Sequence, residues 1–210
     1  MKTKCFFRFI KRTGDIVLSF LAIVLFSWLI LLLSILVLVF SGWPIFYLDK
    51  RVGMKGKEIK VTKFRTMKNH ANENLEKTLS SEQLESWKKE RKIEKDPRIT
   101  KIGRILRKTS FDEIPQVFNI FCGSLSIIGP RPISKIELET HYTEKERKII
   151  LSVRPGLISN WSINGRSNVS FESGLRQKFE LEYFEKFGLA QDIKIFFKVI
   201  PVVISCKGAK

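Results

Sequence analysis

The first 48 residues combine a short basic stretch with a long run of apolar residues. No charged residue occurs between Ile16 and Leu48, and the part from Ile16 to Phe40 is almost entirely Leu, Ile, Val and Phe. A run of this length and composition is typical of a helix in a membrane. A cleaved signal peptide would have a shorter apolar region that ends in small residues. The pattern therefore predicts a membrane-associated segment over residues 1–48.

The charges on the two sides of this segment do not favour one orientation. The upstream flank carries Lys2, Lys4, Arg8, Lys11 and Arg12, and the downstream flank carries Lys50, Arg51, Lys55, Lys57, Lys60, Lys63 and Arg65. Because basic flanks prefer the cytoplasmic side, we favour a re-entrant helix that leaves both flanks at one anionic surface. Its bend is expected at Ser27-Trp28 or Ser34, whose hydroxyls can bond a preceding carbonyl. A single spanning helix is the alternative, since the run is long enough to cross.

Residues 49–210 have a mixed pattern that predicts one mostly helical α+β domain. Two strand-like runs, 44–52 and 57–64, flank a Gly-Met-Lys-Gly sequence at 53–56 and predict a small β-hairpin. Residues 68–96 are rich in Lys, Glu, Asn and Ser, which is typical of a solvated helix or a mobile excursion. Residues 141–157 read as a helix followed by a turn, and Asn164-Gly165 is a tight-turn sequence.

Three further helices follow from the positions of proline and apolar residues. One should begin after Pro97, with Ile99, Ile102 and either Ile105 or Leu106 on its buried side. A second should begin near Asp112 or Glu113, with Asp112 as N-cap, because Pro115 cannot occupy a helix interior. The last apolar run, from 193 to 206, has Lys194 and Lys198 at helical spacing and Pro201 within it. It predicts a bent amphipathic helix at the membrane interface.

Composition narrows the classes of partner. The chain has 210 residues, enough for one sizeable domain, and a formal net charge of +17. This charge requires an anionic partner, which could be nucleic acid, an acidic membrane surface or a phosphorylated substrate. Nucleic acid is disfavoured because the basic residues gather beside an apolar segment and no nucleic-acid-binding motif is present. The three cysteines are far apart, without metal-ligand spacing, and read as free thiols.

The stretch ILRKTSFDEIPQVFN, residues 105–119, places two adjacent carboxylates after a basic run. An acidic pair at a helix start is most simply a cap. Here Arg104, Arg107 and Lys108 precede it and could hold a polyphosphate, and Arg131 lies between two prolines that limit its backbone freedom. A carboxylate beside arginines stays ionised, which suits a nucleophile, and its neighbour could hold Mg²⁺ together with phosphate oxygens.

Several longer motifs carry a resemblance to a known family. They are KFRTM at 63–67, the block DPRITKIGRILRKTSFDEIPQVFNIFCGSLSIIGPRP at 96–132, RPGL at 154–157 and NGRS at 164–167. With these motifs the chain resembles, from about residue 11 to its end, the bacterial sugar transferases, which are monotopic polyprenyl-phosphate phosphoglycosyl transferases. The resemblance implies a UDP-sugar donor, a polyprenyl (usually undecaprenyl) phosphate acceptor, Mg²⁺ and release of UMP. It places the enzyme at the cytoplasmic face of the bacterial inner membrane, where it starts a surface glycan.

The resemblance also implies roles for particular residues. Asp112 would attack the β-phosphorus of the donor and form a covalent phosphosugar enzyme, and Glu113 would help to hold the metal. The residues placed around the phosphates would be Lys63, Arg65, Arg107 and Arg131. Asp192 matches a late acid near the site, and Arg166, beside the Asn164-Gly165 turn, is a weaker candidate for substrate binding. The family supports the re-entrant helix and the interfacial C-terminal helix, and it leaves a homodimer open.

The chain departs from the family pattern at two places. It has Ser27-Trp28 where many members have Ser-Pro, and an altered loop, Gly156-Leu157-Ile158-Ser159 with Trp161-Ser162-Ile163. If that loop contacts the donor, the preference for a sugar would be altered. A non-catalytic membrane scaffold that recruits glycan-assembly partners is the alternative function. The Asp112→Asn substitution separates the two hypotheses, because only an enzyme would lose its function while it keeps membrane binding.

Overall fold

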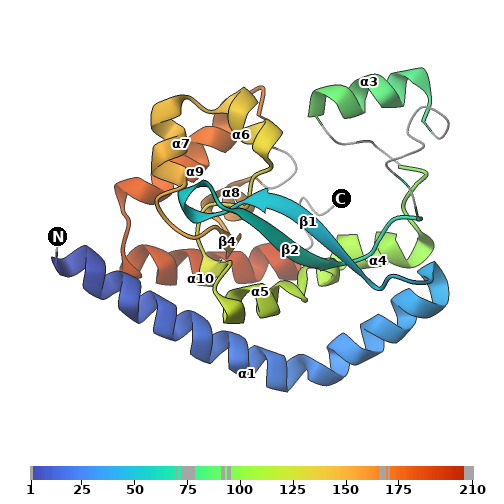
Figure 1. Cartoon of the computed structure of the whole chain (residues 1–210), viewed down its shortest axis with the longest axis horizontal. Helices are drawn as coiled ribbons and strands as arrows, with labels where there is room; N and C mark the ends of the chain where they lie inside the picture. The colour runs from blue at the N-terminus through green and yellow to red at the C-terminus, as the bar shows by residue number, and fades with distance from the viewer. Residues whose placement is uncertain are drawn as a thin grey trace.

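The computed structural model describes residues 2–69, 71, 79–90, 93, 96–165, 169 and 171–205, and it is mostly helical (Figure 1). The α-helices are α1 (Lys2–Ser41), α3 (Ser81–Glu90), α4 (Lys101–Thr109), α5 (Gln116–Cys122), α6 (Lys135–His141), α7 (Glu144–Ile150), α8 (Asn160–Asn164), α9 (Leu175–Glu185) and α10 (Leu189–Ile204). The 3₁₀ turns are η1 (Met54–Gly56) and η2 (Phe111–Glu113), and the strands are β1 (Phe46–Val52), β2 (Glu58–Phe64), β3 (Ser126–Ile128) and β4 (Gly156–Ile158).

Helix α1 is the one helix among the described residues that is long and apolar enough to cross a membrane, over Phe6–Ser41. Figure 1 shows it as a continuous curved helix whose convex side faces away from the rest of the protein. The Ser27 hydroxyl donates to the Val24 carbonyl at 2.9 Å and the Ser34 hydroxyl to the Ile30 carbonyl at 2.7 Å. Such bonds bend helices, so the serines make the contacts expected of them.

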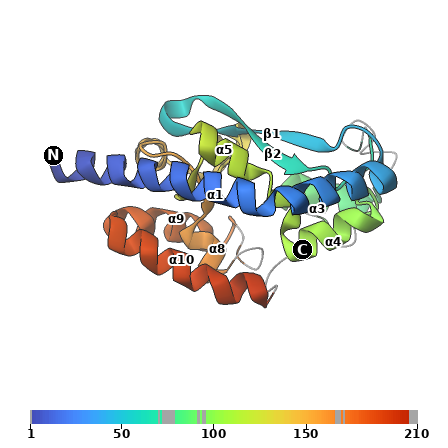
Figure 2. The same ribbon diagram turned by 90° about the horizontal axis from the view of Figure 1, so that it is seen from below.

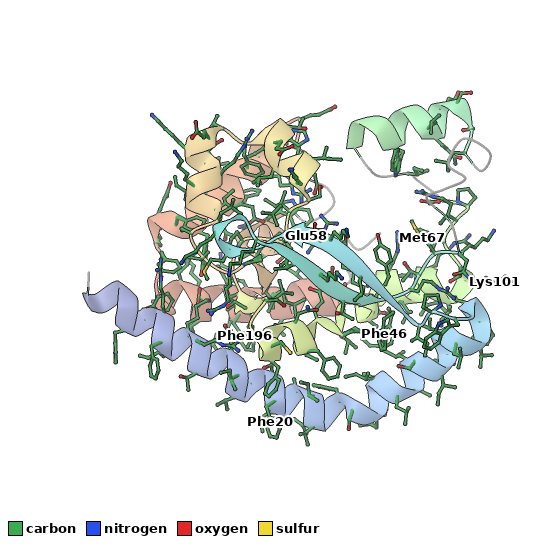
Figure 3. All side chains as sticks on the ribbon, in the orientation of Figure 1. Phe20, Phe46, Glu58, Met67, Lys101 and Phe196 are labelled. Atoms are coloured by element: carbon green, nitrogen blue, oxygen red, sulfur yellow. The ribbon has the colours of Figure 1, made fainter. Side chains whose placement is uncertain are left out.

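The two sides of α1 have different surroundings. Its outward side chains are apolar and exposed. Phe20, labelled in Figure 3, has 52% of its surface exposed, and its ring centroid lies 6.3 Å from that of Phe121 in α5. Its inward side contributes Ile30, Leu33 and Val37 to a buried cluster completed by Phe64 of β2 and Leu106 of α4. The core therefore includes side chains from the apolar segment and from the part of the chain that follows it.

Polar residues near the start of α1 bind two later elements. The Arg12 guanidinium donates to the carbonyls of Ile120 at 2.7 Å and Phe121 at 2.8 Å, in the last turn of α5. The Asp15 carboxylate accepts the amide of Ile127 in β3 at 3.0 Å. These bonds satisfy backbone groups that the short α5 and the short β3 leave without a partner of their own.

The predicted hairpin is present as the antiparallel pair β1 and β2, joined by η1. Tyr47 lies opposite Lys63 and Asp49 opposite Val61, so Lys63, Asp49 and Arg51 point to the same face. The Asn119 side chain of α5 accepts the Thr62 amide at 2.8 Å and donates to a carbonyl of β2. This side chain fixes α5 against the strand that carries Lys63.

The helices around the acidic pair begin later than the sequence predicts. Helix α4 starts at Lys101. Of the two candidates for its buried side, Leu106 is buried, with 1% of its surface exposed, and Ile105 is not, with 59% exposed. The prediction that a helix begins at Asp112 or Glu113 with Asp112 as N-cap is wrong. Helix α5 begins at Gln116, because Pro115, with φ of −60°, takes the N-cap position itself.

The C-terminal half packs on the hairpin and on α1 (Figures 1 and 2). Strands β3 and β4 pair in parallel, and a Cβ on Gly156 would lie 2.1 Å from the Gly129 amide nitrogen, so the two backbones need glycine here. The predicted helix at 141–157 is α7, and Asn164-Gly165 ends α8. Helix α10 contains Pro201, as expected, and exposes Lys194 and Lys198.

Candidate active site

The acidic pair lies in η2, the single 3₁₀ turn between α4 and α5. Helix α4 ends because Ser110 adopts a left-handed conformation, with φ of +61°, and donates its amide to the Arg107 carbonyl at 3.2 Å. Pro115 then opens α5 two residues after Glu113. The end of α4 and the start of α5 therefore fix the backbone of the acidic pair in a short 3₁₀ turn.

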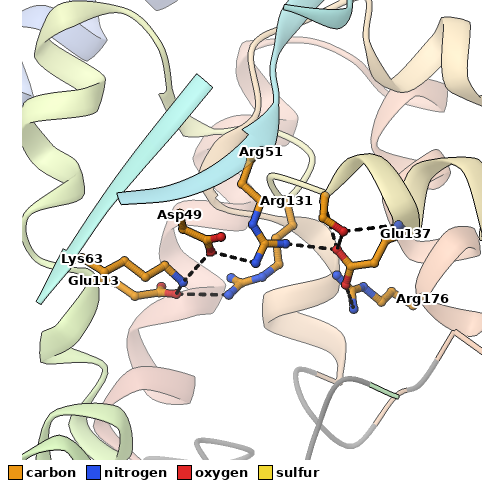
Figure 4. A network of polar contacts seen from close by, with 8 residues as sticks. Asp49, Arg51, Lys63, Glu113, Arg131, Glu137 and Arg176 are labelled. Carbon is orange, nitrogen blue, oxygen red and sulfur yellow. Dashed lines mark hydrogen bonds and ion pairs between the residues drawn. The ribbon is translucent and has the colours of Figure 1, made fainter. Parts of the chain in front are cut away.

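Two cations hold the Glu113 carboxylate. Its Oε1 atom lies 3.1 Å from Arg131 Nη2 and 3.4 Å from Lys63 Nζ (Figure 4). Burial alone would raise the pKa of Glu113, but the charges and hydrogen bonds of Arg131 and Lys63 outweigh it and hold the pKa at about 2. Glu113 is consequently ionised at every physiological pH.

The Asp112 carboxylate differs from its neighbour, because within the described residues it makes no hydrogen bond or ion pair. Burial, followed by the charge of Glu113, raises the pKa of Asp112 to about 6, against the opposing charges of Lys63, Arg107 and Arg131. Asp112 is thus mostly ionised at pH 7, as expected for a nucleophile. Its oxygens keep lone pairs that no other group of the described chain uses.

Arg107 stands beside the pair on the last turn of α4. Its Nε donates to the Thr66 hydroxyl at 2.9 Å, which joins the KFRTM motif to the block at 96–132. Burial lowers the pKa of Arg107, and the nearby Asp112 carboxylate opposes this shift. Helix α4 approaches Thr66 closely at Gly103, where a Cβ would lie 2.1 Å from the Thr66 carbonyl oxygen. Close packing at Gly103 therefore sets the position of Arg107.

A chain of further charged side chains extends from the partners of Glu113 (Figure 4). Asp49 accepts from Arg51 at 2.7 Å, and its carboxylate lies 4.0 Å from Lys63 Nζ. Arg51 also donates to Glu137 at 3.0 Å, and Glu137 lies 3.9 Å from Arg176. Acidic and basic side chains alternate along this chain of contacts. Asp49, itself paired with Arg51, therefore restrains Lys63 on the side away from Glu113.

Some of these charged side chains line one shallow pocket. Its polar lining consists of Asp49, Arg51, Lys63, Glu113, Gln116 and Arg131, and Gly156 and Leu157 of β4 also line it. Three cations and two carboxylates at one opening suit a ligand that brings both phosphate groups and a counter-ion.

Five of the sequence-predicted residues come together at this pocket or beside it: Asp112, Glu113, Lys63, Arg107 and Arg131. Arg65 does not. Its guanidinium donates to the carbonyl of Trp43 at 2.7 Å, to those of Ser41 and Gly42, and to the side chain of Asn69. Arg65 therefore caps the C-terminal end of α1, and its contact with phosphate stays a prediction.

Asp192 also lies in a different cluster. It forms an ion pair with Lys11 of α1 and accepts the Tyr183 hydroxyl at 2.9 Å, and no described contact joins it to the acidic pair. Burial raises the pKa of Asp192, while Lys11 opposes the shift. Arg166 lies outside the described residues, so its predicted role is not addressed by the structure.

Sequence reasoning missed Asp49, Arg51, Glu137 and Arg176. For the first two, the period of two along the hairpin gives a usable pattern, because residues 47, 49 and 51 share the face of Lys63 once the register is known. Glu137 and Arg176 stand on short helices distant in sequence, and nothing local marks them.

The acidic pair fits a magnesium ion that arrives with phosphate. Among the described residues, no group of three or more His, Cys, Asp or Glu side chains could hold a metal by itself. The protein offers the two carboxylates of Asp112 and Glu113, and Mg²⁺ in phosphoryl-transfer sites typically takes one or two carboxylates plus substrate oxygens. Burial and then the charge of Glu113 raise the pKa of Asp112, so a cation held by these residues would offset the repulsion between their two negative charges.

Comparisons with known proteins agree on one family. Residues 6–206 match the family model described as Bacterial sugar transferase. The chain is 39% identical over 201 residues to the exopolysaccharide production protein ExoY of Rhizobium meliloti, a match that covers 95% of this chain and 87% of that protein. It is 38% identical over 204 residues to the undecaprenyl-phosphate galactose phosphotransferase of Salmonella typhimurium, covering 96% of this chain and 42% of that protein.

A third relative names a different sugar. The UDP-glucose:undecaprenyl-phosphate glucose-1-phosphate transferase of Escherichia coli is 34% identical over 197 residues, covering 92% of this chain and 40% of that protein. The galactose and glucose transferases are therefore longer proteins, of which this chain matches less than half.

Proposed function

Because the chain belongs to the bacterial sugar transferase family, we propose that it is a membrane phosphoglycosyl transferase. It moves a sugar 1-phosphate from a UDP-sugar to polyprenyl phosphate, most simply undecaprenyl phosphate, and releases UMP. The names of the relatives support this proposal, because they specify undecaprenyl phosphate as acceptor and UDP-glucose as one donor. The product would be the lipid-linked first sugar of a surface glycan, in line with a relative named for exopolysaccharide production.

The observation that carries the proposal is the difference between two adjacent carboxylates. Glu113 forms ion pairs with Arg131 and Lys63. Asp112 is mostly ionised near neutral pH and has no hydrogen-bond or ion-pair partner among the described residues. A site built only to bind anions would gain nothing from a half-buried, unpaired carboxylate among its cations. A carboxylate that acts as a nucleophile must be ionised and must have a lone pair that no other group uses.

The reaction then takes two steps. An Asp112 oxygen forms a bond to the β-phosphorus as the bond from that phosphorus to the UMP oxygen breaks, which leaves a covalent aspartyl phosphosugar. A polyprenyl phosphate oxygen next attacks the same phosphorus, and Asp112 leaves as a carboxylate. Lys63, Arg107 and Arg131 hold the phosphate oxygens and offset their charge. Bound Mg²⁺, held by Glu113 and Asp112, would supply further neutralisation of the diphosphate.

The test is UMP release by the full chain in lipid nanodiscs with Mg²⁺. A panel of UDP-sugars is supplied with and without undecaprenyl phosphate to the wild type, to Asp112→Asn and to a control, Glu185→Gln, which changes an exposed acid on α9. We expect lipid-dependent release with one donor, lost in Asp112→Asn and kept in the control. Equal release by Asp112→Asn would rule out the aspartyl intermediate. No release from folded wild type with any donor would favour the scaffold function.

We further propose that α1 enters the membrane from the cytoplasmic side and returns to it. The curvature of α1 and the exposed apolar side chains on its outer face support this topology. The α10 side chains Ile193, Phe196 and Phe197 are also exposed, as a helix at the interface requires. In a Cys122→Ser, Cys206→Ser variant, an impermeant maleimide should label Cys5 only after the cells are lysed. Labelling in intact cells would show a spanning helix instead.

A further inference from the structure

Arg131 is held through its backbone as well as its side chain. It lies between Pro130 and Pro132, and proline has no amide hydrogen, so the Arg131 amide is the one backbone donor of this corner. That amide donates to Oε2 of Glu180 on α9 at 3.1 Å. Glu180 has none of its surface exposed. The bond therefore fixes the peptide from which the Arg131 guanidinium reaches Glu113.

The other Glu180 oxygen fixes the surface on which that guanidinium rests. Oε1 accepts the Ser159 hydroxyl at 2.9 Å, and Ser159 is the N-cap of α8. Helix α8 carries Trp161, whose ring centroid is 5.0 Å from the Arg131 guanidinium carbon. A guanidinium at this distance is attracted to the ring face. One carboxylate thus bonds both the backbone of Arg131 and the helix that supports its side chain.

We propose that Glu180 is a positioning residue that sets Arg131 to bind the diphosphate of the nucleotide donor. This inference rests on the proposed function, which assigns Arg131 to the donor phosphates. Glu180 acts through Arg131, because its two oxygens are used by the Arg131 amide and the Ser159 hydroxyl. Glu113 holds the far end of the same side chain, so the arginine is restrained at both ends.

The hydrogen bonds, more than the negative charge, are what this role requires. Burial raises the pKa of Glu180 to about 7, against the hydrogen bonds of Ser159 and Arg131. A carboxyl group retains an acceptor oxygen for the Arg131 amide in either protonation state. Glutamine at this position would keep that acceptor, whereas methionine, of similar size and shape, would leave the amide and the hydroxyl without one.

These two substitutions make the test. UDP is titrated by calorimetry into full-length protein in nanodiscs with Mg²⁺, and UMP release is measured in parallel. Binding by Glu180→Gln should stay within about twofold of wild type, and binding by Glu180→Met should be about tenfold weaker, as expected when a charge-assisted phosphate contact is misplaced. In an Arg131→Ala background, Glu180→Met should add no further loss, because nothing remains to be positioned. Glu185→Gln is the matched control on α9.

A general loss of structure would give a different pattern. If Glu180→Met weakens UDP binding equally with and without Arg131, or if Glu180→Gln binds as weakly as Glu180→Met, the inference is wrong. It is also wrong if wild-type protein does not bind UDP. If UDP binds with the expected coupling to Arg131 but no UDP-sugar yields UMP, the positioning role stands and the proposed function fails. If UMP is released and the two substitutions act independently, the proposed function stands and the inference fails.

Discussion

Asp112 and Glu113 are neighbours in sequence, and their amide substitutions are expected to change the stability of the protein in opposite directions. In the folded protein the pKa of Asp112 is raised from 3.8 to about 6, first by burial and then by Glu113. Its ionisation in the folded state is therefore unfavourable by about 3 kcal/mol at pH 7.5. The pKa of Glu113 is lowered from 4.5 to about 2, because Arg131 and Lys63 outweigh burial, so its ionised form stabilises the fold by a similar amount.

The sign depends on pH in a way that separates this effect from a change in packing. A raised carboxyl pKa costs nothing below pH 3.8, where the group is protonated in both states, and the cost grows until about pH 6. Asp112→Asn removes this cost. Since about 1 kcal/mol moves the Tm of a chain of this size by about 2–4 °C, removing about 3 kcal/mol should raise the Tm by about 6–12 °C at pH 7.5. Near pH 4 the gain should disappear.

The measurement is thermal unfolding of full-length protein in detergent, followed by tryptophan fluorescence, with a chelator present so that no cation compensates the pair. Glu113→Gln should lower the Tm at pH 7.5, because Arg131 and Lys63 lose their partner. Glu185→Gln, at an exposed position of α9, should leave it unchanged. A lower Tm for Asp112→Asn at pH 7.5, or a gain that persists at pH 4, would refute the reasoning.

Three other outcomes are expected. Gly103→Ala should slow UMP release and lower the Tm, because the new Cβ would lie 2.1 Å from the Thr66 carbonyl oxygen and overpacking costs about 1–3 kcal/mol. Gly14→Ala is the control, because a Cβ there meets nothing within 4 Å. Equal effects of the two substitutions would disprove the steric argument. The kcat/KM for the donor should fall as pH drops below about 6, where free Asp112 becomes protonated, and a flat profile down to pH 5 would exclude it as the nucleophile. UMP release should stop with a chelator and return with Mg²⁺; release that continues would show that the carboxylate pair needs no metal.

The parts of the fold that sequence predicts well are those with a local cause. The long apolar helix α1 follows from an uninterrupted apolar run, and the hairpin follows from two strand-like runs around a glycine-bounded turn. Pro115 correctly indicated a break, but the helix starts after it and not before it. The difference arises because Ser110 adopts a left-handed conformation that ends α4 and leaves room for a 3₁₀ turn.

Sequence predicts the acidic pair and its nearest cations, but not the residues that position them. The acidic pair, Lys63, Arg107 and Arg131 lie in motifs recognisable by family resemblance. Glu180 has no such mark, because its importance comes from a bond across 49 positions of sequence to the Arg131 amide. Arg65 shows the opposite case: it lies in a recognised motif, yet its guanidinium is used by the carbonyls at the end of α1. A motif gives residue types, while their partners depend on tertiary structure.

The contacts of Arg12 and Asp15 have a consequence for protein engineering. Replacing α1 by an unrelated membrane anchor would keep the protein at the bilayer, but would remove the groups that bond the last turn of α5 and the amide of Ile127 in β3. Because α5 follows directly from the acidic pair, such a chimaera should be membrane-bound and catalytically weak. Exchanges designed to alter donor choice should therefore be made at the pocket, with the native first helix retained.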